Sequence, residues 1–408
     1  MKYVVIGSSA AGINGIRELR RLDKEAEIVL ISKDKEIYSR CILHHYLGGE
    51  RTIPELNFAE KNFAELYNVN WMKGIACTGV NPAEKTVELE NGEKVSYDKL
   101  LIATGSHTFV PPVKNLREAK NVVGFRNLED MEVLKEAVKT HKDFLVMGAG
   151  LVGIDCVSGL LELGVNITLV EMANWMLSKQ LDEVAAKTYQ DAFTAKGVKQ
   201  YYGDGVKEAV LDEDGNIKGL ILNSGKMISC DYLVVTTGVR ANVEFLEGSG
   251  IETSRFGLVY DETGKTSDDS IYGAGDVSGM RPIWPVAVKE GIIAASNMVG
   301  VPRKMTDFFA SKSTMNFLGI PSMSLGDVNN ERGHSIEYRI TKDSYKKVVH
   351  KNGKITGAVL QGDLAYSGIL QQLIVRRIDI TKLEKPVFDI DYSEFFHVKD
   401  NFEFYYED

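Results

Sequence analysis

The chain has 408 residues, of which 44% are hydrophobic and 26% are charged, and its formal net charge is −9. This length allows two to three domains with full cores, and the acidic balance excludes the basic surface that non-specific nucleic-acid binding requires. No apolar run reaches the ~18 residues that span a bilayer. The four cysteines form no CxxC pair, and the first predicted strand leaves no room for a signal peptide, so we expect a cytoplasmic, reduced protein without membrane insertion.

A first glycine-rich turn follows the predicted strand Tyr3–Ile6. It consists of Gly7-Ser8-Ser9-Ala10-Ala11-Gly12, and an apolar helical pattern and the predicted strand Ile28–Ile31 come after it. In such a βαβ unit the glycines allow a tight turn and close helix packing, so that a pyrophosphate can bind at the helix N-terminus. Asp34, just past the second strand, can accept a ribose hydroxyl. The alternative is an ordinary βαβ unit without a ligand.

A second glycine-rich turn repeats this order in the middle of the chain. Gly148-Ala149-Gly150-Leu151-Val152-Gly153 follows the predicted strand Phe144–Met147, and a helix and the strand Ile167–Val170 come next. Glu171 closes that strand, where a carboxylate favours a free ribose 2′-hydroxyl over a 2′-phosphate. Two such turns in one chain predict two bound dinucleotides, the second of them NAD rather than NADP.

Further predicted elements surround the two turns. Pro111 and Pro112 mark a hinge between the units, and a helix is expected near Leu128–Val138. We expect short strands from about 68 to 105, one strand from Asp231 to Val239, and a strand with a carboxylate turn at Ile271–Val277. Residues 305–408 are expected to form a separate α+β domain, with strands at Ser335–Ile340, Lys346–His350 and Gly357–Leu360 and a helix at Ile369–Val375.

Together these segments resemble the FAD-dependent pyridine-nucleotide oxidoreductases of the glutathione-reductase type. The segments that carry the resemblance are, in order, Gly7–Gly12, Ala103-Thr104-Gly105, Gly148–Gly153, Glu171 and Gly273–Asp276. Tyr38-Ser39-Arg40 and Pro282–Gly291 resemble the branch of the NADH:rubredoxin reductases and the flavin modules of nitrite reductases. The resemblance implies an α/β fold with two Rossmann-like nucleotide-binding domains and a C-terminal α+β domain. Its implied boundaries are 1–111 with 241–304 for FAD, 112–240 for NAD and 305–408 for the C-terminal interface domain.

The resemblance also implies two cofactor sites and no metal site. The residues that would hold FAD are Gly7, Ser8, Ser9, Ala10, Ala11, Gly12, Lys33, Asp34, Arg40, Cys77, Ala103, Thr104, Gly105, Asp276, Val286, Ala287 and Lys312. The residues that would hold NAD are Gly148, Gly150, Leu151, Val152, Gly153, Asp155, Glu171 and Gly238. Ser8–Ala11 would cradle the pyrophosphate, Lys33 and Asp34 the adenosine ribose, and Asp276 the ribityl chain. Two positions depart from the family: Ser32 replaces the usual ribose-binding glutamate, and Asp155 replaces a glutamate beside the nicotinamide.

The implied reaction follows from these two cofactors. A nicotinamide passes a hydride to a flavin, and the flavin can release the electrons singly. The resemblance therefore implies electron exchange between NAD(H) and an iron–sulfur partner, either a rubredoxin or ferredoxin or a subunit of a larger complex. A non-catalytic flavoprotein scaffold is a different alternative.

Cys41 marks another alternative. CoA-disulfide reductases and NADH peroxidases carry one redox cysteine at this point, whereas the rubredoxin-reductase branch more often has proline. A thiol at a helix start beside Arg40 would have a lowered pKa and could serve in the reduction of a CoA disulfide, a persulfide or a peroxide. The other interpretation is a small residue that fills space near the flavin. The chain lacks the CxxxxC pair of the disulfide reductases.

The C-terminal segment Phe388–Asp408 combines aromatic and acidic residues. It holds eight aromatic residues and seven acids against one lysine, Lys399. Such a segment is too aromatic for a disordered tail. Two interpretations stay open: a last strand that covers its own domain, or an arm that docks onto another subunit and so supports a hetero-oligomeric complex.

Overall fold

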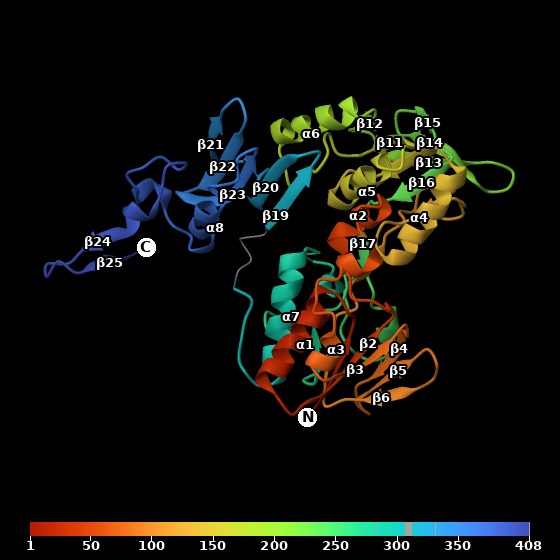
Figure 1. Ribbon diagram of the computed structural model, residues 1–408, viewed down its shortest axis with the longest axis horizontal. Coiled ribbons are helices and arrows are strands. Elements are labelled where there is room, and N and C mark those ends of the chain that lie inside the picture. Colours follow the sequence, from red (N-terminus) through yellow and green to blue (C-terminus); the bar gives the residue numbers. More distant parts are fainter. Residues whose placement is uncertain (281, 307–311, 331, 408) are drawn as a thin grey trace.

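The computed structural model describes residues 1–280, 282–306, 312–330 and 332–407. Residues 307–311, 331 and 408 of the expected C-terminal domain therefore lie outside the described residues. Three units are visible in Figure 1: an N-terminal unit at the bottom, a middle unit above it, and a C-terminal unit beside the middle one. Over the ranges just given, no helix has both the length and the apolar character needed to cross a membrane.

The N-terminal unit is built on a five-stranded parallel sheet of order β18-β7-β1-β2-β3. Its strands are β1 (Lys2–Ile6), β2 (Glu27–Ser32), β3 (Val69–Lys73), β7 (Lys99–Ile102) and β18 (Ile271–Gly273). One face is covered by the packed helices α1 (Ala10–Leu22) and α7 (Trp284–Met298). The other face is covered by an antiparallel meander of β4 (Cys77–Asn81), β5 (Thr86–Leu89) and β6 (Lys94–Ser96). Because β18 and α7 come from late in the chain, this unit is discontinuous in sequence.

The middle unit repeats this architecture. Its parallel sheet has the order β12-β11-β10-β16-β9. The strands are β9 (Val122–Val123), β10 (Asp143–Met147), β11 (Asn166–Val170), β12 (Lys199–Tyr201) and β16 (Tyr232–Val235). Helices α4 (Leu128–Thr140), α5 (Leu151–Leu161) and α6 (Glu183–Ala195) contribute to the core on one side. A meander of β13 (Val206–Leu211), β14 (Ile217–Leu222) and β15 (Met227–Ser229) packs on the other.

The strand expected from Asp231 to Val239 does end at Thr236-Thr237-Gly238, but Val239 belongs to a separate strand. Strand β16 ends at Val235, where the Thr236 hydroxyl donates to the carbonyls of Met147 and Gly148. Gly238 then turns the chain at φ +124°, a conformation that favours glycine. A separate strand β17 (Val239–Ala241) follows and pairs antiparallel with β8 (Ser106–Thr108). This two-stranded ribbon lies where the chain passes between the two Rossmann-type units.

The C-terminal unit is an antiparallel sheet of order β19-β20-β23-β22-β21. Its strands are β19 (Lys312–Phe317), β20 (Ile320–Gly326), β21 (Ser335–Ile340), β22 (Tyr345–Lys351) and β23 (Lys354–Gln361), and α8 (Ser367–Val375) packs on one face. The other face meets α6 of the middle unit, where the Tyr189 hydroxyl donates to the Ile320 carbonyl at 2.5 Å and Gln361 donates to the Ala185 carbonyl. The predicted fold class, two Rossmann-like units and a C-terminal α+β domain, is confirmed.

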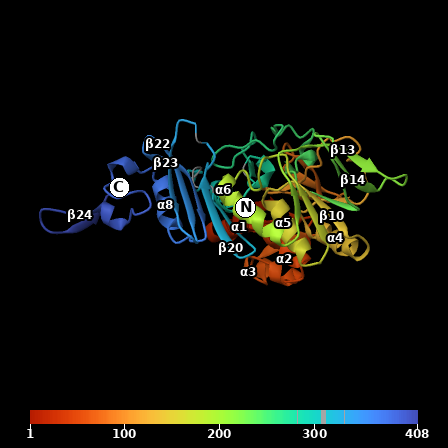
Figure 2. The same ribbon diagram turned by 90° about the horizontal axis from the view of Figure 1, so that it is seen from above.

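The last described residues form a hairpin that lies outside the three five-stranded sheets. Among the described strands, β24 (Phe396–Val398) and β25 (Phe404–Tyr406) pair only with each other. Both ribbon views show this hairpin projecting away from the body of the molecule (Figures 1 and 2). No residue from 391 to 407 is fully buried. The hairpin is therefore an arm and not a last strand that covers its own domain.

Candidate functional site

Both glycine-rich turns have the same tight geometry. Gly7 has φ +113°, and a Cβ there would lie 2.2 Å from the Ala103 carbonyl oxygen. A Cβ on Gly12 would lie 1.9 Å from the Gly7 oxygen, and one on Gly153 would lie equally close to the Gly148 oxygen. Side chains at these positions would push the helix away from its strand. In both units the glycines therefore bring the N-terminus of a helix, α1 or α5, directly against the sheet.

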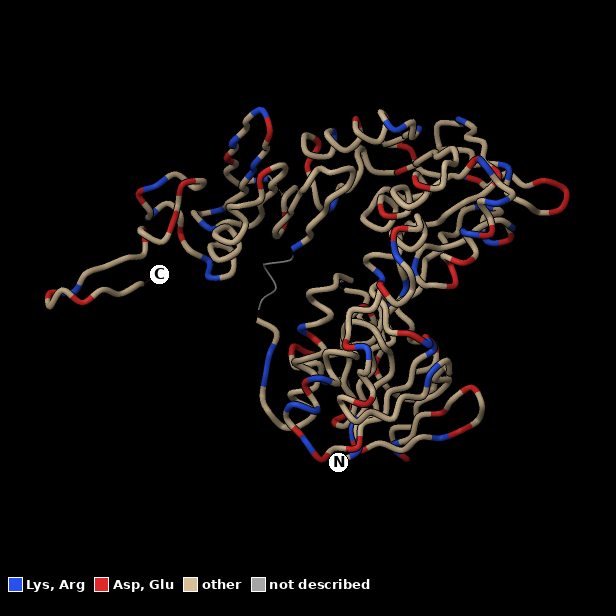
Figure 3. Tube along the Cα trace, in the orientation of Figure 1, with Lys and Arg blue, Asp and Glu red and all other residues tan. Residues whose placement is uncertain are grey.

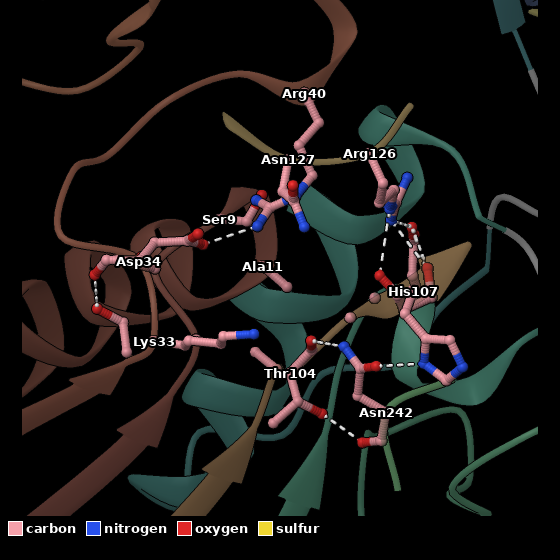
Figure 4. A pocket seen from close by; sticks show the side chains of 18 of the residues that line it. Ser9, Ala11, Lys33, Asp34, Arg40, Thr104, His107, Arg126, Asn127 and Asn242 are labelled. Carbon is pink, nitrogen blue, oxygen red and sulfur yellow. Dashed lines mark hydrogen bonds and ion pairs between the residues drawn. The ribbon is translucent and has the colours of Figure 1, made fainter. Parts of the chain in front are cut away.

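A cavity of about 660 Å³ opens at the N-terminus of α1. In the close-up, Lys33 and Asp34 stand at one end, Ser9 and Ala11 in the middle, and Arg126 and His107 at the other end (Figure 4). The predicted residues that line it are Gly7, Ser8, Ser9, Ala10, Ala11, Lys33, Asp34, Arg40, Cys41, Cys77, Ala103, Thr104, Gly105, Asp276 and Ala287. Most of the predicted FAD residues therefore surround one space.

Three predicted residues do not line this cavity. Gly12 and Val286 are buried in the helices that border it. Lys312 begins β19 in the C-terminal sheet, which packs on α6 of the middle unit, and it is not among the residues that line the cavity. Its expected contact with a flavin stays a prediction.

The middle of the cavity fits a dinucleotide phosphate group. The Ser8 hydroxyl is buried, and among the described residues it has no hydrogen-bond partner. It lies beside the first turn of α1, whose backbone N–H groups carry the positive end of the helix dipole. The Lys33 side chain also extends toward this space (Figure 4). A diphosphate would supply the acceptor oxygens and the negative charge that these groups lack.

At the Lys33 end, the Asp34 carboxylate already has protein partners. It accepts a hydrogen bond from the Tyr38 hydroxyl at 3.0 Å and one from Arg40 Nη2 at 2.7 Å. The Arg40 guanidinium also lies over the Tyr38 ring, 4.8 Å from its centroid. Asp34 thus fixes Arg40 at the cavity wall, in addition to any ribose contact that it makes.

At the opposite end, Arg126 is held by three acceptors. Its guanidinium donates to the Ser106 carbonyl at 3.2 Å, to the Ser106 hydroxyl at 2.8 Å and to Asp276 Oδ2 at 2.5 Å. Sequence reasoning predicted Asp276 but missed Arg126. The one local signal is its position directly before Asn127, whose side chain caps α4. The other lining residues that were missed include Ser106, His107, Asn242 and Trp284.

Asn242 ties the connecting ribbon to the cavity wall. Its side-chain amide nitrogen donates to the Thr104 main-chain carbonyl at 2.8 Å. Its main-chain carbonyl accepts from the Thr104 hydroxyl at 2.8 Å. His107 Nδ1 lies 2.7 Å from the Asn242 side-chain oxygen (Figure 4). The strand end Ala103-Thr104-Gly105 is therefore fixed by a residue from the return strand between the units.

Cys41 borders the same end of the cavity as Arg126 and Asp276. Its side chain is exposed at the cavity wall, and its backbone N–H donates to the Ser39 hydroxyl. The protein packed around it and the nearby Asp155 carboxylate raise the pKa of the thiol. This direction is opposite to the expected lowering, because Arg40 turns toward Asp34 and does not stand beside the sulfur.

Asp155 reaches this junction from the middle unit. Helix α2 (Leu43–Leu47) packs on α5, where a Cβ on Gly159 would lie 3.0 Å from the His44 oxygen. His44 Nδ1 lies 3.4 Å from Asp155 Oδ1. Burial lowers the pKa of His44 to about 4 and raises the pKa of Asp155 well above its usual value. The imidazole is therefore neutral near pH 7, and the two side chains form no ion pair there.

The predicted NAD residues lie on the middle unit and do not border the 660 Å³ cavity. Glu171 braces the second glycine-rich turn, since its carboxylate accepts from the backbone N–H of Ala149 at 2.6 Å and of Ala173 at 2.8 Å. A Cβ on Gly150 would meet nothing within 4 Å, and the same holds at Gly238. The backbone at both glycines is therefore open to an approaching ligand.

Comparison with known proteins agrees with this geometry. The family described as pyridine nucleotide-disulphide oxidoreductase matches residues 1–291, and the rubredoxin NAD+ reductase C-terminal domain matches residues 312–378. The chain is 28% identical over 397 residues to subunit epsilon of the NADH-dependent phenylglyoxylate dehydrogenase of Aromatoleum evansii, with 94% of this chain and 93% of that one covered.

Two further relatives differ in length and in named activity. The nitrite reductase [NAD(P)H] of Bacillus subtilis is 27% identical over 392 residues, which cover 94% of this chain and 48% of that protein. The chain thus spans about half the length of that relative. Among solved structures, a NAD-dependent persulfide reductase from A. fulgidus superposes with a TM-score of 0.85 at 26% identity, covering 96% of this chain and 79% of that one.

Proposed function

The chain belongs to the pyridine nucleotide-disulphide oxidoreductase family, which consists of NAD(H)-dependent oxidoreductases, and we propose that it passes electrons through FAD between NAD(H) and a one-electron iron–sulfur partner. Members of this family typically bind FAD and NAD(P)H. We assign FAD to residues 1–111 and 241–304, NAD to residues 112–240, and leave the C-terminal domain without a cofactor.

One observation carries this proposal: the two predicted cofactor sites approach each other at Cys41. Cys41 and Asp276 both line the cavity. Helix α2, which begins two residues after Cys41, packs on α5 of the middle unit, where His44 Nδ1 lies 3.4 Å from Asp155 Oδ1. Asp155 lies on α5, the helix that starts at the second glycine-rich turn, and Asp276 lines the cavity at the N-terminus of α1. Dinucleotides at the two helix starts would therefore meet near this point, as hydride transfer requires.

When bound, FAD accepts a hydride from the nicotinamide and can release the two electrons one at a time. The chain's own residues bind the two cofactors and orient them. The start of α1 and Lys33 would hold the diphosphate, and the Arg126–Asp276 pair would fix the opposite end. Glu171 would accept the ribose hydroxyls of NAD while it braces the turn beside it.

The cysteines near the cavity bear on the type of electron acceptor that we propose. All four cysteines are free thiols, and Cys41 is the one that borders the cavity at the Asp276 end. The site therefore offers no dithiol that could pass electrons as a pair. A rubredoxin, a ferredoxin or an iron–sulfur subunit can take them singly, which agrees with the rubredoxin-reductase type of the C-terminal domain and with the subunit role of the phenylglyoxylate dehydrogenase relative.

A second candidate function rests on Cys41 itself. One structural relative is a persulfide reductase, and the thiol borders the cavity at the junction of the two units. Against this function, burial raises the pKa of the thiol, which lowers the share of the thiolate, the reactive form.

Steady-state assays with the Cys41→Ser variant separate these candidates. Electron transfer predicts near-normal NADH oxidation with ferricyanide or a purified ferredoxin as the acceptor, and lower activity with NADPH than with NADH. Loss of all turnover in the variant supports the thiol-dependent function instead. Protein that binds flavin but oxidises no NADH with any acceptor supports a scaffold.

A further inference from the structure

The C-terminal arm, residues 391–407, presents an apolar face that no other part of the described chain covers. Cross-strand pairing places Phe396 opposite Tyr406 and Val398 opposite Phe404, so these four side chains share one face of the hairpin. They are between 39% and 70% exposed, and Phe402 at the turn is 83% exposed. An isolated two-stranded hairpin with such a face is marginally stable in water. The arm is therefore shaped for burial against another surface.

The arm is also strongly acidic. It carries five carboxylates (Asp391, Glu394, Asp400, Glu403 and Glu407) against one lysine, Lys399. Lys399 is already paired with Glu403 at 3.0 Å, and Asp391 is paired with Lys385, just before the arm, at 2.8 Å. Asp400 and Glu407 have no cation partner among the described residues. The surface that receives the arm must therefore supply positive charge as well as apolar area.

The same C-terminal unit holds a surface of this kind. Five exposed cations gather where the β22–β23 turn meets the end of α8, and we call them the basic patch: Lys351, Lys354, Arg376, Arg377 and Lys382. The Ile380 N–H donates to the Gly353 carbonyl, which holds the two segments together. Lys382 and Lys354 both contribute to the lowered pKa of Asp379, after the Thr381 hydrogen bonds. Figure 3 shows basic and acidic segments interspersed along the trace, the C-terminal unit included.

The basic patch also offers apolar contact. Val375, the last residue of α8, is 39% exposed beside the two arginines. The aliphatic stems of lysine and arginine cover apolar surface while their charged ends stay in water. Their cationic groups also bind the faces of aromatic rings. A basic patch of this composition suits an arm that is both aromatic and acidic.

From these two surfaces we propose that the arm of one copy docks on the basic patch of a second copy of this chain. The arm points away from its own body in both ribbon views, and among the described residues no hydrogen bond or ion pair joins it to the three lysines of its own patch. The arm and the patch lie in the same unit of each copy. Two copies related by a twofold axis would exchange arms reciprocally, so that both apolar faces are buried at once. This proposal is independent of the proposed function.

The test measures dimer formation by charge-reversal variants of the full chain, with sedimentation equilibrium as the method. The proposal predicts a dimer whose affinity falls as salt is raised. The arm variant Asp400→Lys with Glu407→Lys, and the patch variant Lys351→Glu with Lys354→Glu, each weaken the dimer by about tenfold or more. A chain that carries both reversals regains the dimer, because the attraction is restored with opposite signs. The apolar variant Phe404→Ser with Tyr406→Ser also dissociates it.

The matched control reverses two exposed lysines elsewhere, Lys94→Glu with Lys196→Glu, and leaves the dimer intact. Unchanged thermal unfolding shows that each variant is folded. A chain that is monomeric at all concentrations overturns the proposal, as does a dimer that neither reversal weakens. Assembly through the arm only when a different polypeptide is co-expressed also overturns it, since the occupant is then a foreign subunit.

Discussion

Arg126 Nη2 lies 2.5 Å from Asp276 Oδ2 and joins residues that are 150 positions apart in the chain. The two side chains are 18% and 15% exposed, and Ser106 is their shared neighbour. The pair closes the end of the cavity at which the middle unit approaches. A residue that precedes the middle unit's helix α4 thus anchors the carboxylate that we assign to the flavin ribityl chain.

Loss of this pair is expected to affect both stability and flavin retention. The Arg126→Met variant leaves a largely buried carboxylate without its cation, which costs about 1–3 kcal/mol. We expect a lower melting temperature of the protein without flavin and a weaker affinity for FAD, measured by fluorescence titration. Arg117→Met, which removes an exposed arginine whose hydrogen bonds within the described chain go to the Val110 carbonyl, is the control and changes neither quantity. Unaltered FAD affinity in Arg126→Met would show that the pair is remote from the cofactor.

Single substitutions in the two glycine-rich turns are expected to affect FAD binding and NADH binding separately. A Cβ at Gly12 or Gly153 would lie 1.9 Å from the carbonyl oxygen of Gly7 or Gly148, so each helix start must shift. Gly12→Ala is therefore expected to yield protein with little flavin. Gly153→Ala is expected to stay yellow and to need about tenfold more NADH for half-maximal turnover.

Absorption at the flavin band and steady-state kinetics measure these two outcomes. Gly368→Ala, where an added Cβ meets nothing within 4 Å, is the control and behaves as the unaltered protein. Flavin loss in Gly153→Ala with retention in Gly12→Ala would reverse our assignment of the two sites.

The parts of this site that the sequence predicted are those that depend on neighbouring residues in the chain, and the parts that it missed depend on contacts between distant segments. Each glycine-rich turn lies next to its own strand and helix, so the two units and most residues of the cavity were predictable. Arg126 was not, because its role comes from a contact between distant segments and its own neighbourhood carries no motif. The pKa of Cys41 was predicted in the wrong direction for the same reason. The orientation of Arg40 depends on Asp34 and Tyr38, and not on its position next to the cysteine.

The reactivity of Cys41 gives a pH-dependent prediction. Its pKa is raised, so at a given pH less thiolate is present than in an ordinary thiol, and the rate of alkylation should keep rising beyond the pH at which glutathione levels off. Iodoacetamide labelling of flavin-free protein, with the Cys41 peptide followed by mass spectrometry, measures this profile. A Cys41 that is fully reactive at neutral pH would contradict the structure and favour the thiol-dependent function.

The C-terminal unit is expected to depend on one buried ion pair. Lys347 Nζ lies 3.2 Å from Asp182 Oδ2, and the Tyr345 hydroxyl donates to the same carboxylate. Lys347 is 1% exposed, so Lys347→Met leaves a buried charge and costs about 3–5 kcal/mol in urea unfolding. The double variant with Asp182→Asn recovers part of this loss. Lys346→Met, which breaks the pair with Asp363, a carboxylate that is 53% exposed, costs less than about 1 kcal/mol. Equal losses in the free energy of unfolding for Lys347→Met and Lys346→Met would show that Lys347 does not stabilise the buried Asp182 carboxylate.

The central claim is that one chain holds a flavin and a nicotinamide close enough for hydride transfer. Anaerobic titration of the purified, flavin-loaded protein with NADH, followed at the flavin absorption band, tests it most directly. We predict complete bleaching at one NADH per flavin, with recovery of the colour when a one-electron acceptor is added. A flavin band that stays unchanged in excess NADH, or purified protein that takes up no flavin at all, would contradict the account.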